Sequence, residues 1–399
     1  MSIARHGGNS GAPTGVFDAT RCEVLSGVPA LVDACPGLLD LHEARDGMVA
    51  RVRIPGGYLS RRRLSALATL SEGYGDGQLD LTSRGNVQVR GIAADAVEAL
   101  SARAAELGLL PSVSHDRARN ITASPLEGLG GRPSVRRVVD ALDHSLLGTP
   151  QLANLPGRFL FAVDDGTGGA SLGHSDLGLI CVGSGVELVI AACRTGIKVT
   201  RKDSVCTVVG IATEAVAAGL GTTALHVVDL PGFAATVAEQ LGGSLGEKVL
   251  DVPDRLSPGV LPDATAVVAA AELSRLSSEQ LRLVGALLAT SERARLGAAG
   301  RIVIPTADSE VALEALAAGG LVVADTDPRA DVTACSGVAC ARSLGDVRAW
   351  AQHLPGVGAT HWVGCDRKCG LPADATAVVA VDAKSAQVGA TGQLIEAAS

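Results

Sequence analysis

Alternating apolar and polar positions predict a βαββα order of elements between residues 48 and 107. Ser60 stands where a helix N-cap is expected, ahead of leucines at helical spacing that continue to Gly73. The predicted elements are a strand over 48–54, a helix over 60–73, two strands over 79–92 around a turn at 83–86, and a helix over 93–107.

A similar unit recurs later in the chain. Its predicted elements are a strand over 264–270, a helix over 277–290 with a Ser-x-x-Gln capping box, a strand over 300–305 and a helix over 309–319. The two copies lie too far apart for a solenoid, so a duplicated, two-fold arrangement fits them better. Between the copies, residues 155–193 indicate strands separated by the Gly-rich loop 164–169, and 177–193 indicates two buried strands around a turn.

Length and charge limit the class of protein. The 399 residues suffice for two or three domains or one compound fold. Asp and Glu number 42 against 34 Lys and Arg, and the net charge of −8 excludes a general attraction to nucleic acid or an anionic membrane. Glycines interrupt the apolar run 177–193, so we expect no membrane span. The first thirty residues show no secretory pattern, and we expect a cytoplasmic protein.

The cysteines carry the strongest chemical signal. Nine cysteines, an odd number, indicate reduced thiols, and four of them form the pairs Cys335-x4-Cys340 and Cys365-x3-Cys369. Four thiolates at such spacing favour an iron–sulfur cluster, with a zinc site or unligated core cysteines as the alternatives. The adjacent residues Gly337, Gly364 and Gly370 suit a loop whose backbone N–H groups point at sulfur.

Other candidate residues carry weaker signals. Cys181, Cys193 and Cys206 stand in apolar surroundings typical of buried thiols, whereas Cys35 is a candidate to reach an active site. His115 and His174 are possible ligands or acid–base groups, or polar loop residues. We assign no catalytic residue from these patterns.

A set of arginines predicts an anionic ligand in this acidic chain. Arginine binds carboxylates through two parallel hydrogen bonds, although each single arginine also fits a solvated strand face. The alternation at 51/53 and at 117/119 would place each pair on one face of a strand, which favours a common polyanionic ligand such as a tetrapyrrole. The set comprises Arg51, Arg53, Arg84, Arg90, Arg117 and Arg119.

These segments resemble the nitrite and sulfite reductase superfamily. The resemblance rests on Arg53-Ile-Pro-Gly-Gly, on LTSRGNVQVRGI (81–92), on Arg119-Asn120, on Leu155-Pro-Gly-Arg-Phe159 and on the two cysteine pairs. It implies an α/β fold of two ferredoxin-like modules and two larger α/β halves, related by a pseudo-two-fold. The implied division is an irregular segment over 1–37, a first module over 38–110, a first tetrapyrrole-site half over 111–255, a second module over 256–325 and a cluster-binding half over 326–399.

Further segments resemble a branch of that superfamily that converts precorrin-3A into precorrin-3B in aerobic cobalamin biosynthesis. They are CPGLLDLH (35–42), NITASPLEGL (120–129), RFLFAVDDG (158–166) and CARSLGDVR (340–348). The branch implies an oxygen-dependent meso-carbon hydroxylation with lactone formation, and an external reductant. Because no G-x-G-x-x-G motif opens a strand–turn–helix unit, we expect a partner reductase to relay electrons from NADH. The alternatives are a sirohaem-containing nitrite or sulfite reductase and a non-catalytic tetrapyrrole-binding protein.

The resemblance also implies roles for residues. Tetrapyrrole-binding residues would be Arg53, Arg84, Arg90, Arg119 and Arg158, and ligands of a [4Fe–4S] cluster would be Cys335, Cys340, Cys365 and Cys369. It further implies a mononuclear non-haem iron, for which no ligand pattern stands out. The reductases carry a lysine where this chain has Leu160, and losing that cation disfavours a small anionic substrate. We therefore expect Phe159-Leu160-Phe161 to form an apolar floor, with Arg53, Arg84, Arg119 and Arg158 at its rim.

Overall fold

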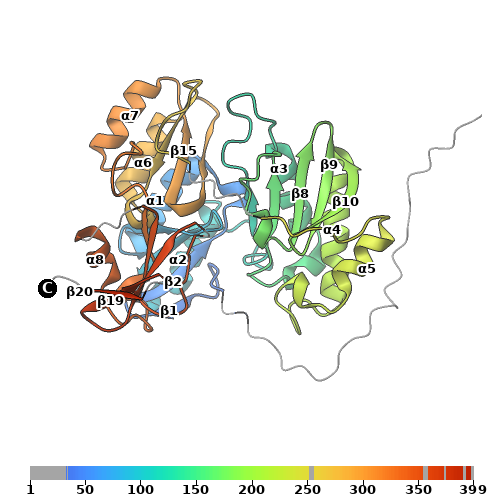
Figure 1. The fold of residues 1–399 in the computed structure, drawn as a ribbon, viewed down its shortest axis with the longest axis horizontal. Helices are drawn as coiled ribbons and strands as arrows, with labels where there is room; N and C mark the ends of the chain where they lie inside the picture. The colour runs from blue at the N-terminus through green and yellow to red at the C-terminus, as the bar shows by residue number, and fades with distance from the viewer. Residues whose placement is uncertain are drawn as a thin grey trace, which may run out of the picture.

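A computed structural model describes residues 33, 35–250, 256–353, 358–372, 374–389 and 392–396. Most of the segment expected to be irregular, residues 1–32 and 34, lies outside the described residues. Figure 1 shows strands β8–β10 with helices α3, α4 and α5 in one lobe, and helices α1, α6 and α7 with the C-terminal strands in the other. No helix within the described ranges has the length and apolar character that crossing a bilayer requires.

In the described part of the chain, two of the four five-stranded sheets are built from the repeated unit. Their strand orders are β1-β2-β5-β4-β13 and β11-β12-β15-β14-β3. The first sheet contains β1 (His42–Ala44), β2 (Gly47–Val52), β4 (Gln78–Leu81), β5 (Val87–Ile92) and β13 (Arg275–Ser277), and the second contains β3 (Tyr58–Ser60), β11 (Gly259–Val260), β12 (Ala266–Ala270), β14 (Arg293–Leu296) and β15 (Arg301–Pro305).

Each repeat contributes one short strand to the sheet of the other. Strand β13 pairs antiparallel with β4, so that Arg275 lies opposite Asp80, and β3 pairs antiparallel with β14, so that Ser60 lies opposite Arg293. The predicted boundaries at 38–110 and 256–325 do not include this exchange. Because the exchange is reciprocal, the two modules form one interlocked body with pseudo-two-fold symmetry.

Equivalent helices pack against each other at the centre of this body. Helix α1 (Arg61–Tyr74) begins at the predicted Ser60, whose hydroxyl accepts a hydrogen bond from the Arg63 amide. Helix α6 (Ser278–Leu287) begins at the predicted capping box, formed by Ser277 and Gln280. Helices α2 (Val97–Glu106) and α7 (Ser309–Ala318) complete the modules, and leucines of α1 and α6 share one buried core.

The other two sheets share one pairing pattern. In sheet β10-β9-β8-β7-β6, strands β6, β7 and β8 pair in parallel and β9 and β10 add antiparallel. In sheet β16-β17-β18-β19-β20, strands β16, β17 and β18 pair in parallel and β19 and β20 add antiparallel. Their strands are β6 (Ile121–Ala123), β7 (Phe161–Asp164), β8 (Leu177–Val182), β9 (Gly185–Ile190), β10 (Cys193–Thr200), β16 (Val332–Ala334), β17 (Thr360–Val363), β18 (Thr376–Ala380), β19 (Ser385–Val388) and β20 (Gln393–Glu396). Helices α3 (Arg136–Leu147), α4 (Arg201–Ala217) and α5 (Phe233–Gln240) accompany the first sheet, and α8 (Val347–His353) the second.

This repeated pairing confirms the predicted fold class of two ferredoxin-like modules and two larger α/β halves.

Candidate functional site

A cavity of about 480 Å³ lies where the two modules and the two larger halves meet. Residues from all four sheet regions line it. They include Arg51 and Arg84 from the first module, Leu160, Ser171 and His174 from the first half, Leu273 and Ala299 from the second module, and Cys335, Arg348, His361, Lys368 and Cys369 from the C-terminal half. The cavity therefore brings together residues that are far apart in the sequence.

Strained backbone is concentrated around this cavity. Five lining residues other than glycine have φ in the left-handed region, namely Ser171 (56°), Leu273 (49°), Ser274 (59°), Ala299 (52°) and Lys368 (48°). Such conformations cost energy and persist where the surrounding structure enforces them, often at functional sites. Their position supports the cavity as the candidate site.

The pseudo-two-fold brings two equivalent turns to the cavity. The turn 82–85 follows β4 and the turn 297–300 follows β14, so Arg84 and Ala299 occupy equivalent positions. One turn carries a guanidinium, whereas the other carries only a methyl group at this point. At this pair of turns the first module therefore presents a cationic side chain to the cavity, and the second module presents a small apolar one.

Three arginines of the first module form a cationic group, of which Arg51 and Arg84 line the cavity, whereas Arg53 lies near them but outside the lining. Arg53 is 3% exposed, and only its Nη2 has a hydrogen-bond partner among the described residues, the Gly157 carbonyl at 3.2 Å. Burial, with the neighbouring Arg51, lowers the pKa of Arg53 to about 9. The pKa values of Arg51 and Arg84 are also lowered, mainly by burial. A buried cation with unused donors favours binding of an anion.

Arg51 was not among the site residues that the family resemblance implied. In the structure Arg51 lines the cavity. The sequence signals that could have identified it were its position in the predicted strand and its alternation with Arg53. Its Nε has no hydrogen-bond partner among the described residues. Arg84 also lines the cavity, and its Nη1 donates to the Arg158 carbonyl at 2.9 Å.

The remaining implied arginines are placed elsewhere. Arg90 donates to both carboxylate oxygens of Asp46 at 2.9 Å, and Arg119 donates to those of Asp143 at 2.7 and 2.8 Å. Neither arginine lines the cavity, and Arg158 is exposed. The predicted strand face at 117/119 is wrong, because these residues lie in the turn region before β6. The ion pairs give Arg90 and Arg119 a structural role.

The expected apolar floor consists of one residue rather than three. Leu160 is fully buried against protein and lines the cavity. Phe159 and Phe161 instead lie in the core of the first half, with ring centroids 4.7 Å apart. Successive side chains of an extended segment point to opposite faces, which explains why they turn away from the cavity.

The predicted cluster cysteines lie in one region of the C-terminal half. The Sγ of Cys335 accepts hydrogen bonds from the amides of Gly337 at 3.4 Å and Gly364 at 3.3 Å. Burial raises the pKa of Cys369, and the nearby Cys365, Cys335 and Cys340 thiolates raise it further. These observations place the thiols in one region of the C-terminal half and supply two N–H donors to the sulfur of Cys335, features that a [4Fe–4S] cluster uses.

The spread of these thiols differs from that of a single-metal site. Within the described ranges, no three His, Cys, Asp or Glu side chains are close enough together to hold one metal ion. A four-iron cluster separates its thiolates more widely, because each thiolate binds a different iron. The described residues therefore provide no ready ligand set for a single metal ion, the implied mononuclear iron included.

The other candidate cysteines and histidines lie in different environments, and of these residues His174 lines the cavity. Cys181 is buried as predicted, whereas Cys206 is exposed on α4 and Cys193 is half-buried. Cys35 is half-buried beside Arg51. His115 is buried against Thr149 and two loop serines, Ser112 and Ser114, whereas His174 lines the cavity.

Comparisons with known proteins agree with this architecture. The nitrite/sulfite reductase ferredoxin-like half domain matches residues 42–107. Ferredoxin–nitrite reductases from Leptolyngbya laminosa and Synechococcus elongatus are 37% and 36% identical over 28% and 30% of this chain. The match covers 24% and 25% of those proteins, about a quarter of their length. The structure of the Mycobacterium tuberculosis NirA protein superposes with a TM-score of 0.69 at 21% identity, covering 86% of this chain and 74% of that one.

The chain thus contains a nitrite/sulfite reductase ferredoxin-like half domain and shares the fold of the NirA protein. A longer match is to a precorrin-3B synthase from Sinorhizobium, which is 28% identical in an alignment of 370 residues that covers 85% of this chain and 78% of the relative. Both predicted resemblances are confirmed.

Proposed function

We propose that this protein is an oxidoreductase of aerobic cobalamin biosynthesis that converts precorrin-3A into precorrin-3B. The observation that carries the proposal is the cavity lining, which combines the guanidinium groups of Arg51 and Arg84, the apolar Leu160, and the thiols of Cys335 and Cys369. A large apolar ring with peripheral carboxylates matches this distribution. The long match to a precorrin-3B synthase supports the same substrate class.

Arg51, Arg53 and Arg84 bind substrate carboxylates in this proposal. Arg53 has two unused donors, Nε and Nη1, and Arg51 has one, Nε, so a carboxylate satisfies groups that the described protein residues leave unpaired. A hydrogen bond to a charged group stabilises binding by about 1.5–3 kcal/mol. These residues orient the ring and leave its reacting edge facing the thiols.

Leu160 and the turn 298–300 shape the space for the ring. Leu160 keeps water and charge away from the face of the macrocycle. The turn Ala298-Ala299-Gly300 contributes no long side chain to the cavity, so it leaves room for peripheral substituents. A volume of about 480 Å³ falls within the range of small-molecule sites, about 300–1,000 Å³.

Cys335, Cys340, Cys365 and Cys369 hold a [4Fe–4S] cluster in this proposal. Such a cluster supplies single-electron transfer between an external donor and the cavity. In a monooxygenase reaction, one atom of O₂ enters the product and the other leaves as water, which requires an electron pair and protons. We propose that an external reductase relays these electrons from NADH, since no G-x-G-x-x-G nucleotide motif opens a strand–turn–helix unit in the sequence. The resemblance also implies a mononuclear iron, to which we assign no residues.

A second candidate function is a sirohaem-containing nitrite or sulfite reductase. The matched half domain and the nitrite reductase relatives favour it. Against it stands Leu160, because reduction of a small anion requires a dense cationic pocket to bind the anion and deliver protons. A non-catalytic tetrapyrrole-binding protein is a third candidate, distinguished by binding without turnover.

Anaerobic purification followed by absorption spectroscopy tests the proposal. A precorrin enzyme shows iron and sulfide in the purified protein and gains tetrapyrrole bands only when precorrin-3A is added. Sirohaem bands in the purified protein would instead support the reductase. Stoichiometric tetrapyrrole binding without oxygen uptake would support the non-catalytic protein.

A further inference from the structure

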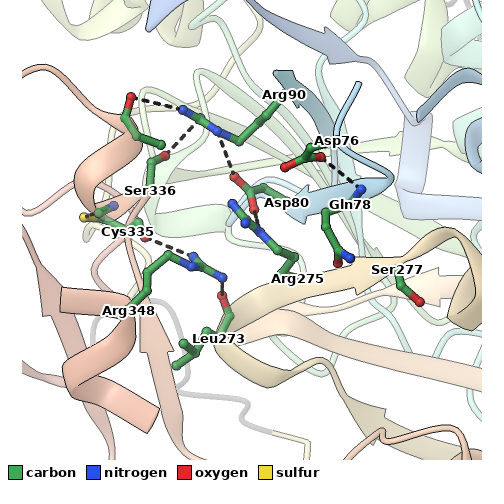
Figure 2. A network of polar contacts seen from close by, with 12 residues as sticks. Asp76, Gln78, Asp80, Arg90, Leu273, Arg275, Ser277, Cys335, Ser336 and Arg348 are labelled. Atoms are coloured by element: carbon green, nitrogen blue, oxygen red, sulfur yellow. Dashed lines mark hydrogen bonds and ion pairs between the residues drawn. The ribbon is translucent and has the colours of Figure 1, made fainter. Parts of the chain in front are cut away.

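A second group of arginines lies next to Cys335 and is separate from the cationic group of Arg51, Arg53 and Arg84. Figure 2 shows Arg90, Arg275 and Arg348 converging from three different segments. Arg275 and Arg90 flank the carboxylate of Asp80, with N–O distances of 2.7 and 3.8 Å. Arg90 also donates to the Ser336 hydroxyl at 3.2 Å, which links the network to the residue after Cys335.

Arg348 differs from the other two arginines in its partners. Its Nη1 donates to the Cys335 carbonyl at 3.0 Å and its Nη2 to the Leu273 carbonyl at 3.1 Å. No ion pair with a carboxylate holds it within the described part of the chain. Burial, with the neighbouring Arg275, lowers the pKa of Arg348 to about 10. Arg348 is therefore a half-buried cation that donates to two backbone carbonyls.

The backbone on both sides enforces this placement. A Cβ at Gly337 would lie 3.1 Å from Cγ of Arg348, so the glycine leaves space for the arginine stem. The same Gly337 donates its amide to the Cys335 sulfur. Leu273 has φ of 49°, a costly conformation for leucine that directs its carbonyl to Arg348. Two constrained residues thus hold one cation against the cysteine loop.

The carboxylates of this network pair with Arg90 and Arg275 rather than with Arg348. Asp46 and Asp80 form ion pairs with these two arginines, and Asp76 also acts electrostatically on Arg275. A partly desolvated cation without a carboxylate partner favours an anion nearby. Arg348 lines the cavity next to Cys335, where a cluster bound by four thiolates carries a net negative charge.

We propose that Arg348 is a positioning residue that holds the Cys335 loop and raises the reduction potential of the cluster bound there. This inference rests on the proposed [4Fe–4S] cluster. Reduction adds one negative charge to the cluster, so a fixed cation in a low-dielectric setting stabilises the reduced form more than the oxidised form. Removing the charge therefore lowers the reduction potential of the cluster. A lysine at the same position retains the positive charge and should keep the potential near its wild-type value.

The test is a redox titration of the anaerobically purified or reconstituted protein, followed by electron paramagnetic resonance of the reduced cluster. The variants are Arg348→Gln and Arg348→Lys, and the matched control is Arg342→Gln. The exposed Arg342 belongs to the same loop region, and its replacement removes the same formal charge at the surface. Iron and sulfide contents are measured for every variant.

We expect Arg348→Gln to bind a full cluster with a clearly more negative midpoint potential than the wild type. Arg348→Lys and Arg342→Gln should remain near the wild-type potential. An unchanged potential in a fully loaded Arg348→Gln protein would overturn the inference, and so would an equal shift in Arg348→Lys. Should Arg348→Gln not fold or load, Arg348→Met is titrated in its place, and a wild-type potential in that variant would likewise overturn the inference. Wild-type protein without iron and sulfide would instead refute the cluster itself.

Discussion

The side-chain amide of Asn86 donates a hydrogen bond to Oδ1 of Asn120 at 2.8 Å, deep between the first module and the first half. Asn86 also accepts from the Ile54 amide at 2.9 Å, and Asn120 donates to the Phe159 carbonyl at 3.1 Å. This chain of bonds joins four of the segments that carry the resemblance to nitrite and sulfite reductases. Both side chains are fully buried, so the bonds fix how the arginine-bearing segments lie relative to one another.

Replacement of Asn86 or Asn120 by alanine should destabilise the protein. Each change leaves buried polar groups unpaired, and we expect a loss of about 1–3 kcal/mol in the free energy of unfolding. The double variant should lose less than the sum of the two, because both changes remove the same bond. Chemical denaturation of the four proteins measures this coupling, with the exposed Asn154→Ala as a control. Strict additivity would contradict the linkage.

Arg53 and Arg119 should respond oppositely to replacement by methionine. Arg119→Met leaves Asp143 without its partner, and loss of a buried ion pair costs about 3–5 kcal/mol. Arg53→Met removes a buried cation with unused donors, so the free energy of unfolding should be unchanged or higher, while tetrapyrrole affinity falls. Denaturation and absorbance titration measure the two quantities. Unchanged tetrapyrrole affinity in Arg53→Met, Arg51→Gln and Arg84→Gln together would remove this group from the site.

Replacing Cys365 or Cys369 by serine should abolish the iron–sulfur cluster and activity. Serine is a poorer ligand for iron, and the remaining three thiolates cannot complete the same set. Cys206→Ser, on the exposed face of α4, should keep full iron and sulfide. Cys181→Ala should mainly lower stability, since Cys181 packs in the core of the first half. Full iron and sulfide in both serine variants at the proposed ligands would exclude this ligand set.

Leu160→Lys should reduce precorrin-3A turnover strongly while the cluster remains intact. The change places an ammonium group on the apolar floor, and burying an unpaired charge costs several kcal/mol unless the group loses its proton or finds a partner. Leu160→Met keeps the apolar character and should retain most of the turnover. Steady-state oxygen uptake with the substrate measures both variants, and equal rates for lysine and leucine would rule out the floor.

Local patterns were sufficient to predict the repeated unit. Ser60 and the capping box at 277–280 mark helix starts through bonds that span three residues, so they are visible in the sequence. The exchange of β3 and β13 is not visible, because strands of three residues carry too little alternation and pair with partners far along the chain. Strand β14 is absent from the predicted elements for a similar reason, since it is only four residues long.

The candidate site was predictable where residue type decides the chemistry. The four cysteines can be selected as candidates because thiolates bind iron, and the flanking glycines because their backbone N–H groups can donate to sulfur. Which arginines face the cavity does not follow, because that depends on distant carboxylates such as Asp143, which pairs with Arg119. The role of Arg348 depends likewise on a contact with Leu273, 75 residues away along the chain.

The most direct test of the central claim is a reaction of the anaerobically purified protein with precorrin-3A, a low-potential reductant and oxygen-18 gas. Mass spectrometry of the product should show a tetrapyrrole one oxygen atom heavier, carrying the label, and formed over several turnovers. The same protein loaded with sirohaem should not reduce sulfite or nitrite efficiently. Efficient reduction of either anion, together with no labelled tetrapyrrole product, would contradict the account.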